Sequence, residues 1–284
     1  MNFKQLLNNG QLDMVLEAHN GLSAKVVNEA GYNAIWASGL SISSSLGLRD
    51  CNEASWSQVL DIVESIYDAS EIPILFDGDS GYGNFNNVRQ LVKRLSHYGI
   101  GGISLEDKNF PKMNSFIGDD QLLVPYQELA GKIKAAQDIK KNDDFVVIAR
   151  TESLIAGLGI DEALERANHY YNAGADAIFI HSKQSDGQEI LDFAKQWNKR
   201  LPLVVAPTTY TSLPIEVLEK LGVSIYLCAN HLMRASLFNM RIVAKLIKEK
   251  KSINGIDQHI SSLEDVFSFL NYKELDLAEN KYSY

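Results

Sequence analysis

Tyr171-Asn-Ala-Gly-Ala-Asp-Ala-Ile178 repeats, with small changes, the earlier stretch Glu29-Ala-Gly-Tyr-Asn-Ala-Ile35. In both stretches a helical pattern ends, a glycine supplies the left-handed turn that closes a helix, and an apolar run begins. The same helix-to-strand junction at distant points of one chain favours a single repeating architecture over two unrelated domains.

Short apolar runs alternate with longer amphipathic stretches throughout the 284 residues, which is the pattern of βα units and a parallel sheet. Eight such runs are predicted strands, and eight strands close a (β/α)8 barrel of the TIM type. The predicted strands are Met14–Glu17, Ala34–Ala37, Pro73–Phe76, Gly102–Leu105, Phe145–Ala149, Ala177–Ile180, Leu203–Ala206 and Ser224–Leu227. The predicted helices between them include Ser57–Asp68, Asn87–His97, Gln127–Lys140, Asp161–Asn172 and Glu189–Lys199.

The domain organisation predicted from these patterns is one barrel domain over residues 1–284, because no low-complexity linker or Pro/Gly-rich boundary interrupts the chain. Residues 229–284 form a predicted C-terminal helical extension, with a long helix over Ala229–Lys250, a short one over Leu263–Asn271 and a charged tail. Surplus helices of this kind pack on a neighbour or cap a barrel, so we expect an oligomer.

The overall charge is acidic: 27 Lys and Arg against 36 Asp and Glu give a formal charge of −9, which makes nucleic acid an unexpected partner. The chain has only Cys51 and Cys228 as cysteines and begins with no signal-like segment, so we expect a reduced, cytoplasmic protein. No apolar run approaches the roughly 20 residues of a membrane-spanning helix. An anionic substrate would need local positive charge from a metal ion, an Arg or backbone N–H groups.

The strand ends are unusually polar, and the active site of a (β/α)8 barrel is built at the carboxyl ends of its strands. The third to sixth predicted strands run into Asp77-Gly-Asp79, Glu106-Asp-Lys108, Arg150-Thr-Glu152 and His181-Ser-Lys183.

Three carboxylates at these ends are the best-supported constellation. Asp77, Asp79 and Glu106 follow adjacent strands, which lie about 4.8 Å apart in a sheet, so they can surround one point. Oxygen ligands with room for water suit Mg²⁺. Each carboxylate taken alone could instead cap a helix or end a strand in solvent.

The basic side chains have two interpretations each. Arg150 at the mouth could grip a phosphate or carboxylate in bidentate fashion, or form a structural ion pair with Glu152 or Glu106. His181 could bind or protonate a substrate oxygen, although a lone histidine is more often structural, and His19 is a weaker candidate.

The second strand is followed by Ser38-Gly39-Leu40-Ser41, where the glycine would let backbone N–H groups approach an anion. Short Gly-Ser turns are common, so the signal is weak. Trp36 lies inside that strand, and the prediction favours a core residue over a platform on which a ligand stacks.

Five stretches carry a family resemblance. The chain resembles the phosphoenolpyruvate mutase/isocitrate lyase superfamily, and within it the mutases, over nearly its whole length. The matching stretches are Trp36–Ser41, Leu46–Trp56, Asp77–Asn87, Glu106–Ser115 and Asn172–Ala177, and the mutase pattern is Glu-Asp-Lys with Asn-Ser at the end of Glu106–Ser115.

The resemblance implies an isomerase that interconverts phosphoenolpyruvate and 3-phosphonopyruvate for phosphonate biosynthesis. It implies Asp77 as the direct Mg²⁺ ligand, with Asp50, Asp79 and Glu106 holding the metal's waters. It further implies a substrate-binding set and a catalytic set: Trp36, Ser38, Gly39, Leu40 and Ser115 in the first, and Asp50, Lys112, Asn114, Arg150 and His181 in the second.

Glu106-Asp-Lys-Asn-Phe-Pro-Lys-Met-Asn-Ser115 is, in this interpretation, a metal-site strand end that continues into a gate. Lys112 and Asn114 of the gate would close over the anion and keep water out. Asp50 could be a transient phosphoryl acceptor or could only orient the metal's waters. Two departures from the family stand out: Gly78 replaces the Ala of many relatives, and Phe116–Leu123 does not align.

Three rival functions are weighed against a mutase. A phosphonopyruvate hydrolase shares the metal site but replaces the gate asparagine, so Asn114 argues against it. A C–C lyase of the isocitrate or methylisocitrate lyase type carries a catalytic Cys where this chain has Lys108–Ser115, and neither cysteine falls there. A scaffold protein that had lost catalysis should have lost an acidic ligand or Arg150. The resemblance also implies a homotetramer, a dimer of dimers that exchange C-terminal helices.

Overall fold

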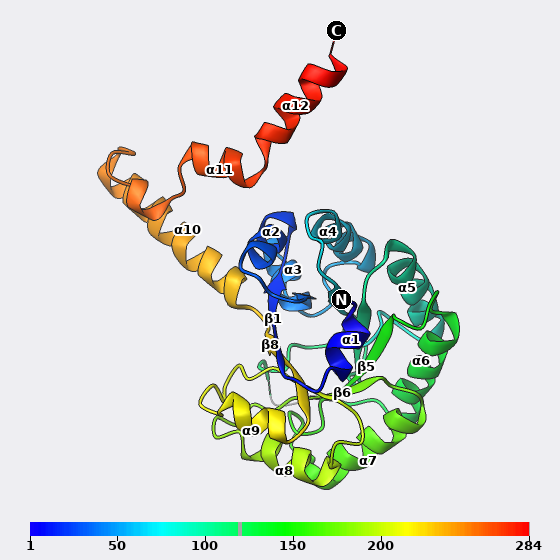
Figure 1. Cartoon of the computed structure of the whole chain (residues 1–284). Helices are drawn as coiled ribbons and strands as arrows, with labels where there is room; N and C mark the ends of the chain where they lie inside the picture. The colour runs from blue at the N-terminus through cyan, green and yellow to red at the C-terminus, as the bar shows by residue number, and fades with distance from the viewer. Residues whose placement is uncertain (119–120, 284) are drawn as a thin grey trace. The chain divides into compact units, whose positions relative to one another are not determined.

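The strands form a closed ring. The computed structural model describes residues 1–118 and 121–283, and within them eight parallel strands pair in chain order, with the last strand paired to the first (Figure 1). The predicted (β/α)8 barrel is confirmed, and each predicted strand overlaps one in the structure. The strands are β1 (Asp13–Ala18), β2 (Ile35–Ala37), β3 (Ile74–Asp77), β4 (Gly102–Glu106), β5 (Val146–Thr151), β6 (Ala177–Ile180), β7 (Leu203–Val205) and β8 (Val223–Cys228).

Helices surround the ring in the order that βα units require (Figure 1). The five predicted helices overlap α4 to α8, and the repeated junction of the sequence has its left-handed glycines, Gly31 at φ 80° and Gly174 at φ 95°. The helices of the barrel unit are α1 (Phe3–Asn8), α2 (Gly21–Glu29), α3 (Gly39–Ser45), α4 (Trp56–Asp68), α5 (Phe85–Tyr98), α6 (Tyr126–Ile139), α7 (Gly159–Asn172), α8 (Gln188–Trp197) and α9 (Ile215–Lys220).

One local prediction needs correction. The stretch after β2 was expected to be a Gly-Ser turn, but it begins a helix, because the Ser38 side chain accepts a hydrogen bond from the Ser41 N–H and caps α3. The short helices α1 and α9 were not predicted either. Helices of six or seven residues carry too few turns for a hydrophobic period to show in the sequence.

The core has two layers. One cluster of buried side chains lies between the sheet and the outer helices. A second cluster fills the barrel, where Trp36, Leu75 and Phe179 of the strands join Phe3 and Leu6 of α1. Since α1 also packs against Gly101, directly before β4, its apolar side chains close the amino-terminal end of the barrel and leave the opposite end for the site.

The inward-facing positions of the strands become charged at the carboxyl ends. Successive side chains of a strand point to opposite faces, so residues two apart share a face. The interior residues Leu75, Ser104, Ile148 and Phe179 are therefore followed, two positions on, by polar ones at the mouth. These are Asp77, Glu106, Arg150 and His181, of which the first three lie inside β3, β4 and β5 and not after them as predicted.

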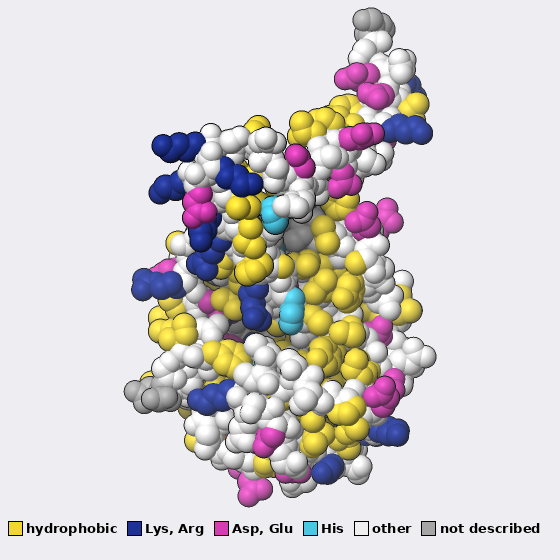
Figure 2. All heavy atoms as spheres, turned by 90° about the vertical axis from the view of Figure 1, so that its left-hand side faces the viewer, with side chains coloured by type: hydrophobic (Ala, Val, Ile, Leu, Met, Phe, Trp, Pro, Cys, Tyr) yellow, Lys and Arg dark blue, Asp and Glu magenta, His cyan; other side chains and the backbone are white. Residues whose placement is uncertain are grey.

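The chain divides into two compact units, Met1–Met233 and Arg234–Tyr284. The predicted long helix is α10 (His231–Lys250), and η1 (Asp257–His259), α11 (Leu263–Phe269) and α12 (Tyr272–Tyr282) follow. The segment expected to be a charged tail forms the helix α12. None of the described side chains in these four helices is buried, and exposed hydrophobic side chains are visible in Figure 2. Among the described helices, none is both long and apolar enough to span a membrane.

Gly78, the departure from the family noted above, has no room for a side chain. A Cβ atom built there would lie 2.7 Å from two carbons of the Ile103 side chain and 2.9 Å from the carbonyl oxygen of Ser104. We expect Gly78→Ala to lower the free energy of unfolding by about 1–3 kcal/mol through overpacking. Urea denaturation measures the loss, and Gly78→Ala combined with Ile103→Val should recover part of it. Unchanged stability of the single variant would contradict this packing.

Candidate active site

A cavity opens at the carboxyl ends of the strands and collects most of the predicted site residues. It has a volume of about 60 Å³, room for several water molecules. Ten of the thirteen predicted residues line it: Trp36, Ser38, Leu40, Asp50, Asp77, Lys112, Asn114, Ser115, Arg150 and His181. The remaining three, Gly39, Asp79 and Glu106, contact residues of this lining.

Gly39 allows the start of α3 to approach the acidic side chains. Its N–H donates a hydrogen bond to Oδ2 of Asp77 over 3.0 Å. A Cβ atom at this position would lie 3.1 Å from Oδ1 of Asp79 and 3.2 Å from Oδ2 of Asp77. The glycine is therefore needed for this close contact between backbone and carboxylates.

The three predicted metal ligands are buried side by side. Burial raises the pKa of Asp77, raises that of Asp79 to about 6 and raises that of Glu106 to about 7, because each would ionise away from water. Oε1 of Glu106 is buried and accepts no hydrogen bond from the described residues. Within that part of the chain, no three His, Cys, Asp or Glu side chains are placed to hold a metal ion by themselves.

Lys112 of the predicted gate lies among these acids. Its Nζ is 2.7 Å from Oδ1 of Asp50 and 2.8 Å from Oδ1 of Asp79. Asn114 donates from Nδ2 to Oδ2 of Asp50 over 2.6 Å. Burial alone would raise the pKa of Asp50, but Lys112 and the hydrogen bond from Asn114 outweigh it and lower the pKa, so Asp50 is ionised at neutral pH.

Arg150 forms the ion pairs that were one of its two predicted roles, and it also lines the cavity, where the other role stays a prediction. Its Nε lies 2.5 Å from Oε1 of Glu152 and 3.5 Å from Oε2 of Glu106, so the ion pairs are present. The same side chain lines the cavity, and its guanidinium lies over the ring of Phe179, 4.8 Å from the ring centre. Two carboxylates and an aromatic face thus fix its direction.

His181 is buried beside Arg150. Its Nδ1 is 3.0 Å from both Oε1 of Glu152 and Nη2 of Arg150. Burial chiefly lowers the pKa of His181, so the ring is neutral at pH 7. Phe116 of the gate covers the ring edge-on at a centroid distance of 5.5 Å. His19, the weaker candidate, is buried against Glu17 and does not line the cavity.

Trp36 is a core residue, as predicted, and also reaches the cavity. Only 2% of it is exposed, and it packs edge-on against Phe179 with ring centroids 6.3 Å apart. The two rings form an apolar wall below the charged side chains, which lowers the local dielectric and strengthens the electrostatic contacts above it.

The gate is fastened at its base. We define the gate as residues 109–122, of which 119–120, inside the stretch that does not align with the family, lie outside the described residues. Lys108 and Leu123 form an antiparallel bridge, and the N–H of Val124 donates to the carbonyl of Asp107 over 2.9 Å. The two ends of the gate are therefore held together.

Asp107 anchors that base to α7. Its buried carboxylate accepts hydrogen bonds from Tyr170 at 2.8 Å and from Arg166 at 3.2 Å, and Arg166 also donates to the carbonyl of Val124. Burial raises the pKa of Asp107, against the attraction of Arg166. None of these residues lines the cavity, so the base of the gate is anchored separately from its tip.

The structure adds three residues that the sequence did not assign to the site. Glu152 was seen only as a partner of Arg150, and Lys108 only as part of a motif. Both continue the two-residue alternation past the strand end, Ile148 to Arg150 to Glu152 in β5, so the period could have revealed them. Asn52 carries no such signal: at φ 58° it accepts a hydrogen bond from the N–H of Lys112 and donates one to Asp79.

The fold and the site together define a (β/α)8-barrel enzyme with a gated, charge-rich cavity at its mouth. The family model described as phosphoenolpyruvate phosphomutase matches residues 3–248. The phosphoenolpyruvate phosphomutase of Tetrahymena pyriformis is 46% identical over 280 residues, which are 98% of this chain and 93% of that protein. The chain belongs to the phosphoenolpyruvate phosphomutase family.

Solved structures agree with this assignment. The crystal structure of phosphoenolpyruvate phosphomutase from Streptomyces platensis subsp. rosaceus has a TM-score of 0.96 and 38% identity, covering 99% of this chain and 98% of that one. A phosphonopyruvate hydrolase in complex with oxalate and Mg²⁺ has a TM-score of 0.91 and 38% identity, covering 98% of this chain and 97% of that one.

Proposed function

We propose that this chain is a phosphoenolpyruvate mutase, which interconverts phosphoenolpyruvate and 3-phosphonopyruvate by intramolecular phosphoryl transfer. The observation that carries the proposal is the gate: Lys112 and Ser115 are 7% and 5% exposed, and Asn114 holds Asp50 at the edge of the cavity. The polar face of the gate thus points inward. This arrangement supports a reaction that must exclude water from a migrating phosphoryl group.

We propose Mg²⁺ as the cofactor, held by Asp77 directly and by Asp79, Glu106 and Asp50 through water. The donor set fits, because its ligands are carboxylate oxygens, and Oε1 of Glu106 is buried with no hydrogen bond from the described residues. When bound, the ion supplies positive charge to the carboxylate and carbonyl oxygens of the pyruvyl unit. The hydrolase complex with oxalate and Mg²⁺ supports a divalent metal in relatives.

The remaining roles, binding of the substrate carboxylate and of the phosphoryl group, belong to side chains and backbone groups of this chain. Ser38, Gly39 and Leu40 bind the substrate carboxylate at the start of α3, on the mouth side of the apolar wall that includes Trp36. The guanidinium of Arg150 faces the phosphoryl group and offsets its charge in a loose, metaphosphate-like transition state. Neutral His181 faces the phosphoryl group beside Arg150, with its Nδ1 held by Glu152.

The gate keeps the transferred group from water. The enol oxygen and C3, between which the phosphoryl group moves, belong to one pyruvyl unit. A water molecule in the cavity would capture the phosphoryl group instead and give pyruvate and phosphate. Lys112 and Asn114 close the side facing Asp50, and Ser115 closes the side facing Glu152. A phosphonopyruvate hydrolase would instead admit water at this point.

The product fits phosphonate biosynthesis as the pathway, and we propose a cytoplasmic location because both cysteines, Cys51 and Cys228, are free thiols. We further propose a homotetramer in which dimers exchange the helices of residues 234–284. That unit has no buried side chains in its described helices, and a second copy would cover its exposed apolar residues. These include Leu237, Phe238, Met240, Leu263 and Leu277, each more than two-fifths exposed.

The activity is tested by phosphorus NMR of the chain with 3-phosphonopyruvate and Mg²⁺. We expect phosphoenolpyruvate as the product. Asn114→Ala removes the amide that holds Asp50, so we expect the share hydrolysed to pyruvate and phosphate to rise, or turnover to fall, by about tenfold. Asn109→Ala, the same change at an exposed residue of the gate, is the control. Pyruvate and phosphate as the main products of the unaltered chain would reject the mutase.

Metal binding should depend on pH, because Mg²⁺ competes with protons for Asp79 and Glu106. Their raised pKa values, about 6 and about 7, stabilise the metal-free fold at low pH, and this contribution is lost as pH rises through those values. Saturating Mg²⁺ should therefore raise the Tm by about 5 °C at pH 8 and by much less at pH 5.5. Thermal unfolding with Mg²⁺ or EDTA measures this. An equal shift at both pH values, or none in either, would refute the site, and Asp77→Asn should abolish the shift.

Assembly is tested by size-exclusion chromatography with light scattering. We expect a mass about four times the 31.6 kDa of one chain. Phe238→Asp, at a side chain 69% exposed in the structure, should dissociate the assembly because the charge would be buried in the interface. Lys245→Asp on the polar part of α10 is the matched control. A monomeric unaltered chain would exclude the exchange of helices.

A further inference from the structure

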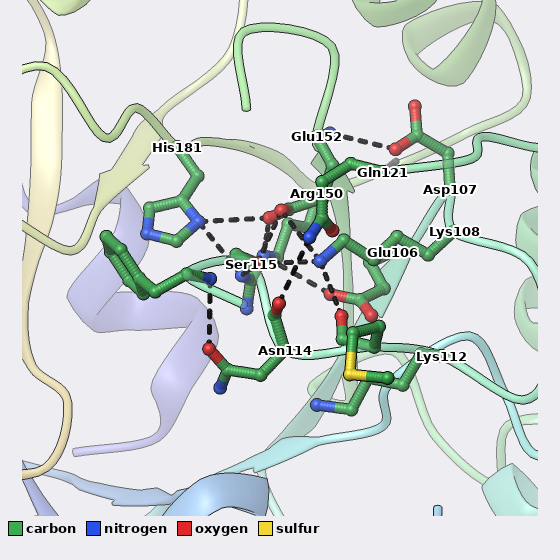
Figure 3. Close-up of polar contacts among 12 residues, drawn as sticks. Glu106, Asp107, Lys108, Lys112, Asn114, Ser115, Gln121, Arg150, Glu152 and His181 are labelled. Carbon is green, nitrogen blue, oxygen red and sulfur yellow. Dashed lines mark hydrogen bonds and ion pairs between the residues drawn. The ribbon is translucent and has the colours of Figure 1, made fainter. Parts of the chain in front are cut away.

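Glu152 contacts four side chains at the barrel mouth, those of Ser115, Arg150, His181 and Lys108 (Figure 3). It is fully buried, and its two oxygens contact different parts of the site. Oε1 lies 2.5 Å from Nε of Arg150 and 3.0 Å from Nδ1 of His181. Oε2 lies 2.6 Å from Oγ of Ser115 and 3.3 Å from Nζ of Lys108. One oxygen therefore faces the substrate-facing side chains, and the other faces the gate.

The hydroxyl of Ser115 can make only one arrangement of hydrogen bonds. It accepts from Nζ of Lys108 at 2.8 Å and from Nη2 of Arg150 at 3.2 Å. Lys and Arg are donors only, so the single proton of the hydroxyl must go to Glu152. The gate residue is thus held by two cations and one carboxylate, and only the carboxylate can accept its proton.

Nδ1 of His181 has a similar restriction. It cannot donate to Glu152 and accept from Arg150 at once, because the neutral ring carries one proton on one nitrogen. The negative charge of Glu152 favours the tautomer with the proton on Nδ1, which leaves Nε2 as an acceptor. Glu152 therefore fixes the protonation pattern of His181 as well as the direction of Arg150.

We propose that Glu152 is a positioning residue that couples closure of the gate, through Ser115 and Lys108, to the orientation of Arg150 and His181. Its consequence is kinetic: the substrate-facing side chains are aligned only when the gate residue is latched, so the phosphoryl group is released only into a closed cavity. This control of water access rests on the proposed mutase activity, whereas the latch itself does not.

Glu152→Gln tests this role, because the amide cannot accept all the hydrogen bonds that the carboxylate accepts. The amide has one acceptor oxygen and one NH₂ group, which only donates. With NH₂ at the position of Oε2 it opposes the ammonium of Lys108, and at the position of Oε1 it opposes Nε of Arg150. In either orientation one half of the coupling is broken. Ser115→Ala removes the hydroxyl contact with Oε2, but Lys108 still links Oε2 to the gate through the carbonyl of Met113, so the coupling is weakened and not abolished.

The first readout needs no activity. Limited trypsin digestion of the whole chain without substrate, followed by mass spectrometry, measures cleavage after Lys112, which is buried when the gate is closed. We expect cleavage about tenfold faster in Glu152→Gln and Ser115→Ala, because each variant loses one charge-assisted hydrogen bond that holds the gate. Asp192→Asn, which removes one negative charge from an ion pair with Lys195 on α8, should be cut at the unaltered rate.

The second readout is the share of 3-phosphonopyruvate hydrolysed, by phosphorus NMR. Glu152→Gln should raise that share about tenfold and lower kcat about 100-fold, since misplaced groups lose their alignment. Ser115→Ala should raise the share with a smaller loss of kcat. A folded Glu152→Gln variant with unaltered cleavage, or with a hydrolysed share within twofold, overturns the proposal. If Glu152→Gln does not fold, Ser115→Ala decides the latch by its cleavage rate. If the unaltered chain forms no phosphoenolpyruvate, the proposed function fails, while the digestion still tests the latch.

Discussion

Charged side chains taken out of water must neutralise one another, and this constraint governs every contact at the barrel mouth. Five carboxylates meet three permanent cations there, while His181 is neutral. If all five ionise, two negative charges are left over, which is the charge that a divalent cation would balance. Burial is the main cause that raises the pKa of Asp79 to about 6 and that of Glu106 to about 7, and neighbouring carboxylates add to the rise. The groups are Asp50, Asp77, Asp79, Glu106 and Glu152 against Lys108, Lys112 and Arg150.

The gate buries polar side chains and exposes apolar ones, the reverse of the usual pattern in a folded segment. Its polar residues Lys112 and Ser115 are buried, whereas Phe110, Met113 and Ile117 are 47% to 58% exposed. Hydrophobic burial therefore contributes little to closing it, and ion pairs and hydrogen bonds to Asp50 and Glu152 hold it instead. Contacts of this kind are individually worth only about 1–3 kcal/mol, which suits the proposed role of a segment that opens in each turnover.

Much of this architecture could be predicted from sequence because it depends on local periods. The eight strands, the left-handed glycines at Gly31 and Gly174, and the placement of Asp77 and Arg150 at strand ends all follow from alternation and turn chemistry. What escaped prediction depends on contacts between distant segments. Asn52 reaches Lys112 across 60 positions of sequence, and no strand or helix period marks it. The tail helix α12 escaped because its polar composition resembles a solvated tail.

With the proposed coupling, a mutase and a hydrolase on one scaffold would differ in when the gate closes, and not in the ligands of the metal. In the proposed assignment both would use the same acids and the same arginine, and both would cleave the phosphorus–carbon bond of 3-phosphonopyruvate. The proposed coupling through Glu152 places the difference in whether the arginine can assume its working direction while the gate is open. A carboxylate shared by Arg150 and the gate makes the two events one, because the low dielectric above Trp36 and Phe179 penalises any state in which a cation loses its partner. Selection for a dry cavity should therefore act on the coupling through Glu152 as strongly as on the gate residues themselves.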